Sequence, residues 1–314
     1  MKNFNYLPNQ YTKDQNTKLS HSYLVEQFSD YSNILKKITK VIKNADYTLG
    51  NEVNKFEKTI SKRMKCKNTI AVGNGTDALF LVLKAFGIGK GDEVITTPFT
   101  FIATVGSIVT SGAKPVFVDV KEDYNIDEKK IEKAITKKTK AIMPVHWAGK
   151  PCELKTIQKI AKKYNLKIIQ DSCHAIDSRY YGKSIVSFGD ACTFSLHPLK
   201  NLNVWGDGGF ILTNKDTLAK KLYLLRNHGL KNRDNCEIFG FNSRLDTIQA
   251  VVANYKLKLK LDKITKARIE NAHFLDKLLS KNPFVLTLKR NKNIKEVFHL
   301  YQVNVKTKRD QLIK

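Results

Sequence analysis

The 314-residue sequence predicts an α/β protein with a mainly parallel sheet that is covered by helices on both faces. Short apolar strands alternate with helical segments between residues 69 and 215, which is the main reason for this prediction. Glycine-rich turns separate strands from helices, as at Gly73–Gly75. The contents of 42% hydrophobic and 27% charged residues are typical of a soluble globular protein, and the length suffices for one large domain and part of a second.

The elements are expected in the following order. A polar arm at residues 1–20 precedes an amphipathic helix from Tyr23 to about Ala45, in which apolar residues recur every three or four positions. A second helix is expected from Glu52 to Met64. The expected strands are 69–72, 93–97, 115–119, 141–147, 167–171, 192–196 and 297–305. The expected later helices are 77–84, one that opens at 99–104, 126–135, 154–164 and a long one at 245–279.

Composition and charge argue against several classes of protein. The formal net charge of +26 does not predict nucleic-acid binding, because lysines are spread along helices without a segment of arginines and aromatics; it is compatible with a polyanionic substrate such as a nucleotide diphosphate. No apolar run predicts a membrane span, and the N-terminus lacks the apolar core of a secretory signal. Five cysteines without a C-x-x-C pair predict reduced thiols in a cytoplasmic protein, with neither disulfides nor a metal site.

The first candidate site is the glycine turn after the strand Thr69–Val72. There Gly73-Asn-Gly-Thr76 leads into a helix with Asp77 in its first turn. The unpaired N–H groups and the dipole at such a helix start favour an anion, so the turn is a candidate phosphate site, and a plain tight turn is the alternative. The turn also fits the loose dinucleotide pattern G-x-G-x-x-A. The acid that this pattern requires is missing at the end of the second strand.

Three further residues are candidates for chemistry. Lys200 follows Ser195 by five positions in a small, aromatic and apolar setting; burial there lowers an ammonium pKa and leaves an amine that can attack a carbonyl. A surface lysine is the alternative. Asp171 ends a strand at the edge where open α/β sheets bind ligands, and surface capping is the alternative. Phe101 is either a core residue or a flat platform for a ring.

These features together match the needs of pyridoxal 5′-phosphate (PLP). Its phosphate requires helix N–H groups and hydroxyls, which Gly75–Asp77 and Ser195 supply. Its pyridine nitrogen requires a carboxylate such as Asp171, its ring a stacking partner such as Phe101, and its aldehyde an amine. Lys200 supplies the amine. No single feature is specific, so the prediction depends on their combination in this order.

Eight motifs resemble those of one known family. They are Gly73-Asn-Gly-Thr-Asp-Ala-Leu79, Asp92-Glu-Val-Ile-Thr-Thr-Pro-Phe-Thr-Phe-Ile-Ala-Thr104, Pro144-Val-His146, Gln170-Asp-Ser-Cys-His174, Phe194-Ser-Leu-His-Pro-Leu-Lys200, Gly206-Asp-Gly-Gly209, Asn242-Ser-Arg244 and Phe298-His-Leu-Tyr301. In combination they resemble the DegT/DnrJ/EryC1/StrS family of sugar aminotransferases, from about residue 20 to the end. The resemblance implies a PLP-dependent homodimer of fold type I, the aspartate aminotransferase-like fold, with a central sheet of the seven-stranded type.

The resemblance also implies roles for individual residues. Lys200 would bind the cofactor as a Schiff base, the internal aldimine, and serve as general acid and base, while Asp171 would bond the pyridine nitrogen. The other implied cofactor contacts are Gly75, Thr76, Asp77 and Ser195 at the phosphate, Phe101 on the ring, and His174 beside the ring oxygen. Asn242 of the partner subunit would reach the phosphate, and the implied substrate contacts are Arg244, His197 and His299.

The implied reaction moves an amino group from glutamate to the keto group of a nucleotide-linked (dTDP, UDP or GDP) deoxysugar, in two half-reactions of the kind used in polysaccharide and O-antigen biosynthesis. One branch of the family carries histidine at the position of Lys200 and dehydrates its substrates, so the lysine favours transamination. The alternative is a PLP-binding regulator or an inactive relative. The Leu-Asp pair after Arg244 points weakly to C3 of the sugar.

Three parts of the chain are expected. Residues 1–50 form an N-terminal arm and helix, residues 51–250 a large PLP-binding domain, and residues 251–314 a linking helix and the start of a small α+β domain. The resemblance implies that relatives continue beyond the His-Leu-Tyr segment. We therefore expect either an abbreviated small domain or a sequence that is a piece of a longer protein.

Overall fold

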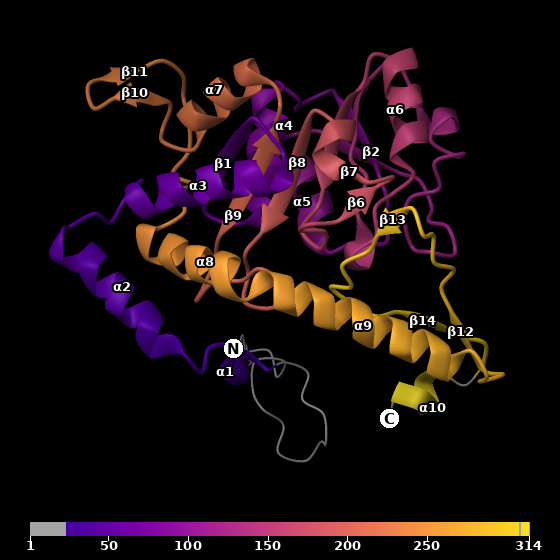
Figure 1. The fold of residues 1–314 in the computed structure, drawn as a ribbon. Helices are drawn as coiled ribbons and strands as arrows, with labels where there is room; N and C mark the ends of the chain where they lie inside the picture. The colour runs from indigo at the N-terminus through magenta and orange to yellow at the C-terminus, as the bar shows by residue number, and fades with distance from the viewer. Residues whose placement is uncertain (1–22, 308, 314) are drawn as a thin grey trace, which may run out of the picture.

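A seven-stranded sheet forms the centre of the computed structural model, which describes residues 23–307 and 309–313 (Figure 1). The predicted polar arm at residues 1–20 lies outside the described residues. In spatial order the strands are β1 (Asn68–Val72), β9 (Gly209–Thr213), β8 (Ala191–Ser195), β5 (Lys167–Asp171), β4 (Thr139–Ile142), β2 (Glu93–Thr96) and β3 (Lys114–Phe117). Only β9 runs antiparallel to its neighbours. The sheet is therefore mainly parallel, as predicted.

Alternating side chains of the strands face two different layers of helices. On one face, residues such as Ile70 and Ile211 pack with α4 (Gly75–Ala85), α5 (Ile102–Thr110) and α7 (Asp216–Leu225). On the other face, Phe210 and its neighbours pack with α2 (Tyr31–Lys43), α3 (Asn51–Met64) and α8 (Thr247–Leu259), and Ile142 packs with α6 (Leu154–Lys163). Because both faces are covered, the strands read as continuous apolar runs.

Four expected elements differ from the structure. The first helix is divided into α1 (Leu24–Gln27) and α2, because the Asp30 carboxylate between them bonds Tyr255 and Lys260 of another helix. The long helix is divided at Lys260 into α8 and α9 (Leu261–Leu279), although the two lie almost in line (Figure 1). The expected helix at 126–135 is wrong: only a 3₁₀ turn forms at Glu132–Ala134, since the Asp127 side chain accepts a bond from the Lys129 amide and favours a turn.

The expected strand at 297–305 is also wrong. Only β14 (Val303–Val305) pairs, with β12 (Val285–Thr287), while β13 (Ile294–Lys295) joins β6 (Arg179–Tyr180) and β7 (Lys183–Ser184). Phe298 has a left-handed backbone (φ 46°), which breaks an extended run. The segment instead lies against Gly149, where an added Cβ would stand 2.8 Å from the Val297 side chain and 3.0 Å from the His174 carbonyl oxygen.

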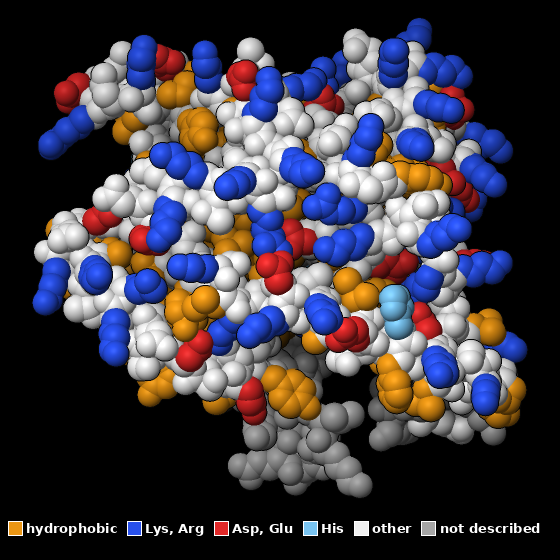
Figure 2. All heavy atoms as spheres, viewed as in Figure 1, with side chains coloured by type: hydrophobic (Ala, Val, Ile, Leu, Met, Phe, Trp, Pro, Cys, Tyr) orange, Lys and Arg blue, Asp and Glu red, His pale blue; other side chains and the backbone are white. Residues whose placement is uncertain are grey.

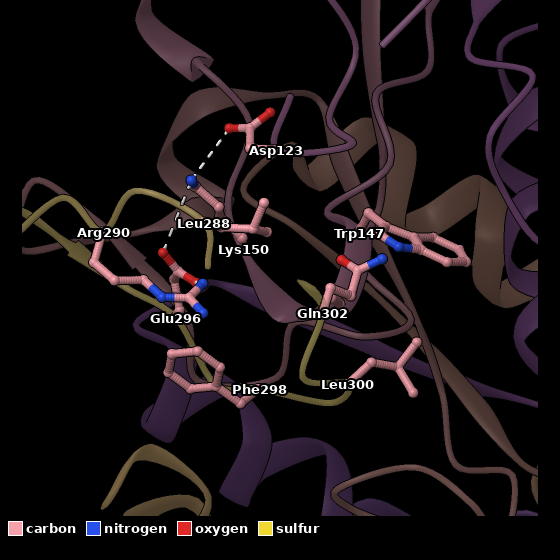
Figure 3. A pocket seen from close by; sticks show the side chains of 10 residues that line it. Asp123, Trp147, Lys150, Leu288, Arg290, Glu296, Phe298, Leu300 and Gln302 are labelled. Carbon is pink, nitrogen blue, oxygen red and sulfur yellow. Dashed lines mark hydrogen bonds and ion pairs between the residues drawn. The ribbon is translucent and has the colours of Figure 1, made fainter. Parts of the chain in front are cut away.

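A network of charges holds this C-terminal segment to the large part of the molecule. The Lys150 amine lies 3.2 Å from the Asp123 carboxylate and 3.9 Å from that of Glu296, between the two (Figure 3). Arg290 bonds Glu296 at 2.9 Å and also pairs with Asp276. The cavity among these side chains holds about 10 Å³, enough for about one water molecule, so it has no room for a substrate.

The remaining described elements are peripheral. They are β10 (Leu230–Asn232), β11 (Asn235–Cys236) and α10 (Arg309–Ile313). Lysine and arginine side chains are spread over the whole face seen in Figure 2 without gathering into one patch. No described helix combines the length and apolarity that a membrane crossing needs. The described residues also contain no group of three His, Cys, Asp or Glu side chains that could hold a metal ion.

Candidate active site

A pocket of about 1100 Å³ opens at the carboxyl ends of the parallel strands. β5 ends at Asp171 and β8 at Ser195, while β1 leads through a glycine turn into α4. Ten of the twelve predicted site residues line this pocket: Gly75, Thr76, Asp77, Phe101, Asp171, His174, Ser195, His197, Lys200 and His299. The sequence-predicted residues thus meet in one place although they come from five separate segments of the chain.

The start of α4 provides the predicted anion cradle. Asn74 caps the helix, since its Oδ1 accepts a bond of 2.8 Å from the Asp77 amide. The amides of Gly75 and Thr76 have no hydrogen-bond partner among the described residues and are available to an anion. A Cβ on Gly75 would stand 2.8 Å from the Ser195 Cβ, so only glycine allows β8 and α4 to approach this closely.

The side chain of Asp77 does not take part in this cradle. Its Oδ2 accepts a bond of 2.7 Å from the Ser243 hydroxyl, whose oxygen in turn accepts a bond of 3.0 Å from the Gly73 amide. The Ser195 hydroxyl oxygen accepts a bond of 3.2 Å from the His197 amide, which leaves the hydroxyl proton available for donation. Two amides and one hydroxyl can therefore bind an oxyanion here.

The Asp171 carboxylate is buried and held from two sides. The Thr104 hydroxyl in α5 donates to Oδ2 at 2.7 Å, and the Cys173 amide donates to Oδ1 at 3.1 Å. The Thr104 hydroxyl also lies 2.7 Å from that of Thr100. These bonds fix the direction of the carboxylate at the edge of the pocket, where it can accept a proton or a hydrogen bond from a ligand.

Lys200 lies in the turn after β8, where its amide donates to the His197 carbonyl at 2.8 Å. Burial of the side chain lowers the pKa of the Lys200 amine, and the nearby Cys173 and Asp171 act in the opposite direction. A lowered pKa increases the fraction of neutral amine, which is the form that attacks a carbonyl carbon.

An aromatic wall stands beside this amine. The His174 ring lies 4.2 Å from that of His299 and 5.1 Å from that of Trp147, between ring centroids. Burial, followed by neighbouring positive charge, holds the pKa of both histidines well below the ordinary value, so both rings are neutral. The Nδ1 atom of His174 is buried without a partner in the described structure. Phe101 is 68% exposed, unlike a core residue, and offers its ring to the pocket.

The remaining predicted contacts differ in position. His197 lines the pocket, and burial followed by the charge of Lys200 lowers its pKa, with Asp207 acting in the opposite direction. Asn242 is exposed, and Arg244 donates from Nη1 to the Asn227 side chain at 3.0 Å; neither lines the pocket of its own chain.

Four of the pocket residues to which the sequence assigned no role are polar or aromatic side chains that shape the site. Asn74 could have been found as a helix N-cap three positions before Asp77. Thr104 stands one turn after Phe101 on α5, so its direction follows once that helix is recognised. Trp147 and Arg268 gave no signal, because only the folded chain brings the loop after β4 and the helix α9 to this pocket.

A sequence model of the DegT/DnrJ/EryC1/StrS aminotransferase family matches residues 29–314. The chain belongs to this family. A transaminase for dTDP-3-amino-3,6-dideoxy-alpha-D-galactopyranose from Aneurinibacillus thermoaerophilus is 42% identical over 274 residues, which are 87% of this chain and 75% of that protein. A pleiotropic regulatory protein from Geobacillus stearothermophilus is 42% identical over 293 residues, 92% of this chain and 78% of that one.

Solved structures with the same fold include two that are similar to this chain over most of its length. DesV of S. venezuelae, in complex with a ketimine intermediate, is 34% identical with a TM-score of 0.89, over 92% of this chain and 78% of that one. NtdA of Bacillus subtilis, with its bound cofactor PMP, is 29% identical with a TM-score of 0.83, over 96% of this chain and 72% of that one. The predicted family and fold class are confirmed.

Proposed function

We propose that this protein is a PLP-dependent aminotransferase that transfers an amino group from glutamate to the keto group of a nucleotide-linked deoxysugar. The observation that carries the proposal is the pocket in which the half-buried Lys200, the carboxylate of Asp171 and the free amides of Gly75 and Thr76 meet. Relatives that are 42% and 43% identical are named for dTDP-sugar and UDP-sugar substrates, which supports this substrate class.

The residues of the pocket fit the cofactor. The amides of Gly75 and Thr76 and the Ser195 hydroxyl would hold its phosphate, and Asp171, fixed by Thr104 and the Cys173 amide, would bond the pyridine nitrogen. The exposed ring of Phe101 would cover the cofactor ring, and His174 would direct its unpartnered Nδ1 at the ring oxygen. When bound, PLP supplies an electron sink that makes the α-proton of an amino acid acidic.

The residues of the chain supply binding and proton transfer. In the first half-reaction the Lys200 amine would accept the α-proton of the amino donor at Nζ and pass it to the bound cofactor. In the second, the same amine would move a proton from the cofactor to the sugar carbon that receives nitrogen. The neutral rings of His174 and His299 line the space beside Lys200 without adding positive charge that would disfavour its protonation. His197 and His299 are the proposed contacts of the substrate inside this chain.

The proposal includes a homodimer with shared sites. Asn242 and Arg244 do not line the pocket of their own chain, although Ser243 between them bonds Asp77 of that pocket. In the neighbouring subunit they would reach the cofactor phosphate and the carboxylate of the donor. We also propose that residues 51–250 form the PLP-binding domain, that residues 251–314 begin a small domain, and that the enzyme works in the cytoplasm with its five cysteines reduced.

Borohydride trapping tests the assignment of Lys200. Wild-type protein mixed with PLP should absorb at the edge of the visible range, as PLP bound through a lysine does. Reduction should then fix one cofactor per chain on a peptide that contains Lys200. Lys200→Ala should trap none and lose turnover, while Lys129→Ala, an exposed lysine, should behave as wild type. Full trapping by Lys200→Ala would refute the assignment.

A regulatory role is the second candidate, because the Geobacillus stearothermophilus relative is named a regulatory protein. An aminotransferase that holds PLP loses its visible absorbance when glutamate is added, since the amino group moves to the cofactor. A regulator keeps the absorbance. Titration of the PLP-loaded protein with glutamate therefore separates the two functions.

A further inference from the structure

Arg268 is a cation that lines the pocket and has no role in the proposed reaction. It lies two turns into α9, the helix that continues the line of α8 in Figure 1, and it lines the pocket together with Lys200, His299 and Leu300. Its side chain is half-buried. A guanidinium in such a place needs negative charge nearby or pays a desolvation cost.

Arg268 has no counter-ion among residues 23–307 and 309–313. Its Nη1 donates to the carbonyl oxygens of Phe298, at 2.9 Å, and His299, at 3.2 Å, which satisfies one nitrogen. Its Nε and Nη2 form no hydrogen bond within the described residues, and no described carboxylate forms an ion pair with it. Burial alone lowers the pKa of Arg268.

Three other buried or half-buried arginines of the chain are neutralised by acids. Arg63 pairs with Asp177 and Asp262, Arg226 with Glu57, and Arg290 with Asp276 and Glu296. None of these three lines the large pocket. Arg179 and Arg244 are also half-buried and form no ion pair among the described residues, but neither lines the large pocket. Arg268 is therefore the unpaired arginine that faces this pocket.

The charges around Arg268 also favour an anion. Lys200, Arg268 and His197 all act on the pKa of His299, so these groups surround one side of the pocket. Of the three acids that line the pocket, Asp171 is engaged by Thr104 and the Cys173 amide and Asp77 by Ser243. The third, Asp207, is exposed to solvent and forms no ion pair with Arg268. The free edge of a guanidinium, with two parallel N–H groups, matches the two oxygens of a carboxylate or a phosphate.

We propose that Arg268 is the anion subsite of this pocket and binds an oxyanion of a substrate through Nε and Nη2. The proposal deepens the proposed function and rests on it, because both substrates of that reaction carry such a group. The amino donor has carboxylates, and the nucleotide sugar has a diphosphate. Arg268 binds while the Lys200 amine carries out the proton transfers.

Calorimetric titration of the PLP-loaded protein tests the subsite with two probes, 2-oxoglutarate for the carboxylate and dTDP or UDP for the diphosphate. Arg268→Met should weaken the binding of one probe about 10-fold to 100-fold, the range for a charged hydrogen-bonded pair. Arg268→Lys, which keeps the charge without the two-pronged edge, should lose less. Lys263→Met removes an exposed charge from the same helix and should change neither dissociation constant.

The pattern of losses identifies the ligand group. Weaker binding of 2-oxoglutarate alone assigns Arg268 to the donor carboxylate, and weaker binding of dTDP or UDP alone assigns it to the diphosphate. Unchanged affinity for every probe in Arg268→Met overturns the subsite. So does a variant that binds all probes normally but has an altered cofactor spectrum, because Arg268 would then only support residues 298–299. Wild-type protein that takes up no PLP overturns the proposed function, and the subsite with it.

Discussion

Lys256 predicts how the stability of this protein depends on pH. It is fully buried in α8, where its amine donates to the Asn203 side chain and, at 3.1 Å, to the Gln27 side chain, and stands 4.6 Å from the centre of the Phe28 ring. Burial lowers its pKa to about 7, the charges of Lys260 and Arg268 add to the effect, and Asp30 opposes it. The same contacts support catalysis, since Asn203 also donates to the Pro198 carbonyl in the turn that holds Lys200.

The sign of the pH effect follows from proton linkage. The unfolded chain holds the Lys256 proton up to a pH of about 10.5, whereas the folded chain releases it at about 7. Between these values the unfolded state binds more protons, so the contribution of Lys256 to stability rises with pH and is least favourable below pH 7. Each pKa unit corresponds to about 1.4 kcal/mol, which gives about 5 kcal/mol as an upper bound over the whole interval.

Urea unfolding of wild type and Lys256→Met at pH 6.5, 8 and 9.5 measures this effect, at one protein concentration and with saturating PLP. The free energy of unfolding of wild type should increase relative to that of the variant by about 2 kcal/mol or more between the first and last pH. Lys258→Met, an exposed change on the same helix, should keep a constant difference from wild type. If Lys256→Met also keeps a constant difference, the argument from burial is refuted.

Two further substitutions probe the pocket itself. Gly75→Ala should weaken PLP binding about tenfold or more in a fluorescence titration, because the added Cβ would stand 2.8 Å from the Ser195 Cβ. The control is Gly106→Ala, where the added Cβ would have no atom within 4 Å. This variant should leave PLP binding unchanged and stabilise α5 by about 0.5–1 kcal/mol. Thr104→Val should lower the affinity for PLP about tenfold, because Asp171 loses a charged hydrogen bond of about 1.5–3 kcal/mol. The control Thr110→Val, on the same helix, should keep the wild-type affinity. If Thr104→Val binds PLP as tightly as wild type, the proposed role of Thr104 is contradicted.

Local sequence patterns were sufficient to predict six of the seven strands of the sheet and ten residues that line the pocket. A parallel strand reads as an apolar run, and the first charged residue after the run marks its carboxyl end, as at Asp171. All such ends lie at one edge of the sheet, so predicting the ends also predicts that their side chains meet. The turn at Gly73–Gly75 was also predicted from the local sequence, since glycine is typical of positions where another strand approaches the backbone closely, as β8 does at Gly75.

Elements that depend on distant partners could not be predicted in this way. β9 follows the loop that contains Lys200 and lies antiparallel between β1 and β8. Its position and direction depend on hydrogen bonds with both neighbouring strands, of which β1 is distant in the sequence. The break between α1 and α2 depends on Asp30 reaching Lys260 across the molecule, and nothing near Asp30 in the sequence indicates that partner. The segment at 297–305 has the alternation of a strand, yet its contact with Gly149 bends it out of a ladder.

Lys200 and Arg268, two cations of the pocket, also differ in whether near or distant parts of the sequence determine their surroundings. Lys200 belongs to a local motif, because the strand and the turn that bury its amine are its own sequence neighbours. Arg268 belongs to α9, whose sequence around this position resembles that of an ordinary solvent-exposed helix. Its side chain is held by the carbonyl oxygens of residues 298 and 299, which the C-terminal segment brings to the pocket. If Arg268 binds a substrate anion, substrate recognition depends on how that segment lies against Gly149 and Lys150. Changes there should then alter substrate affinity without altering the binding of PLP.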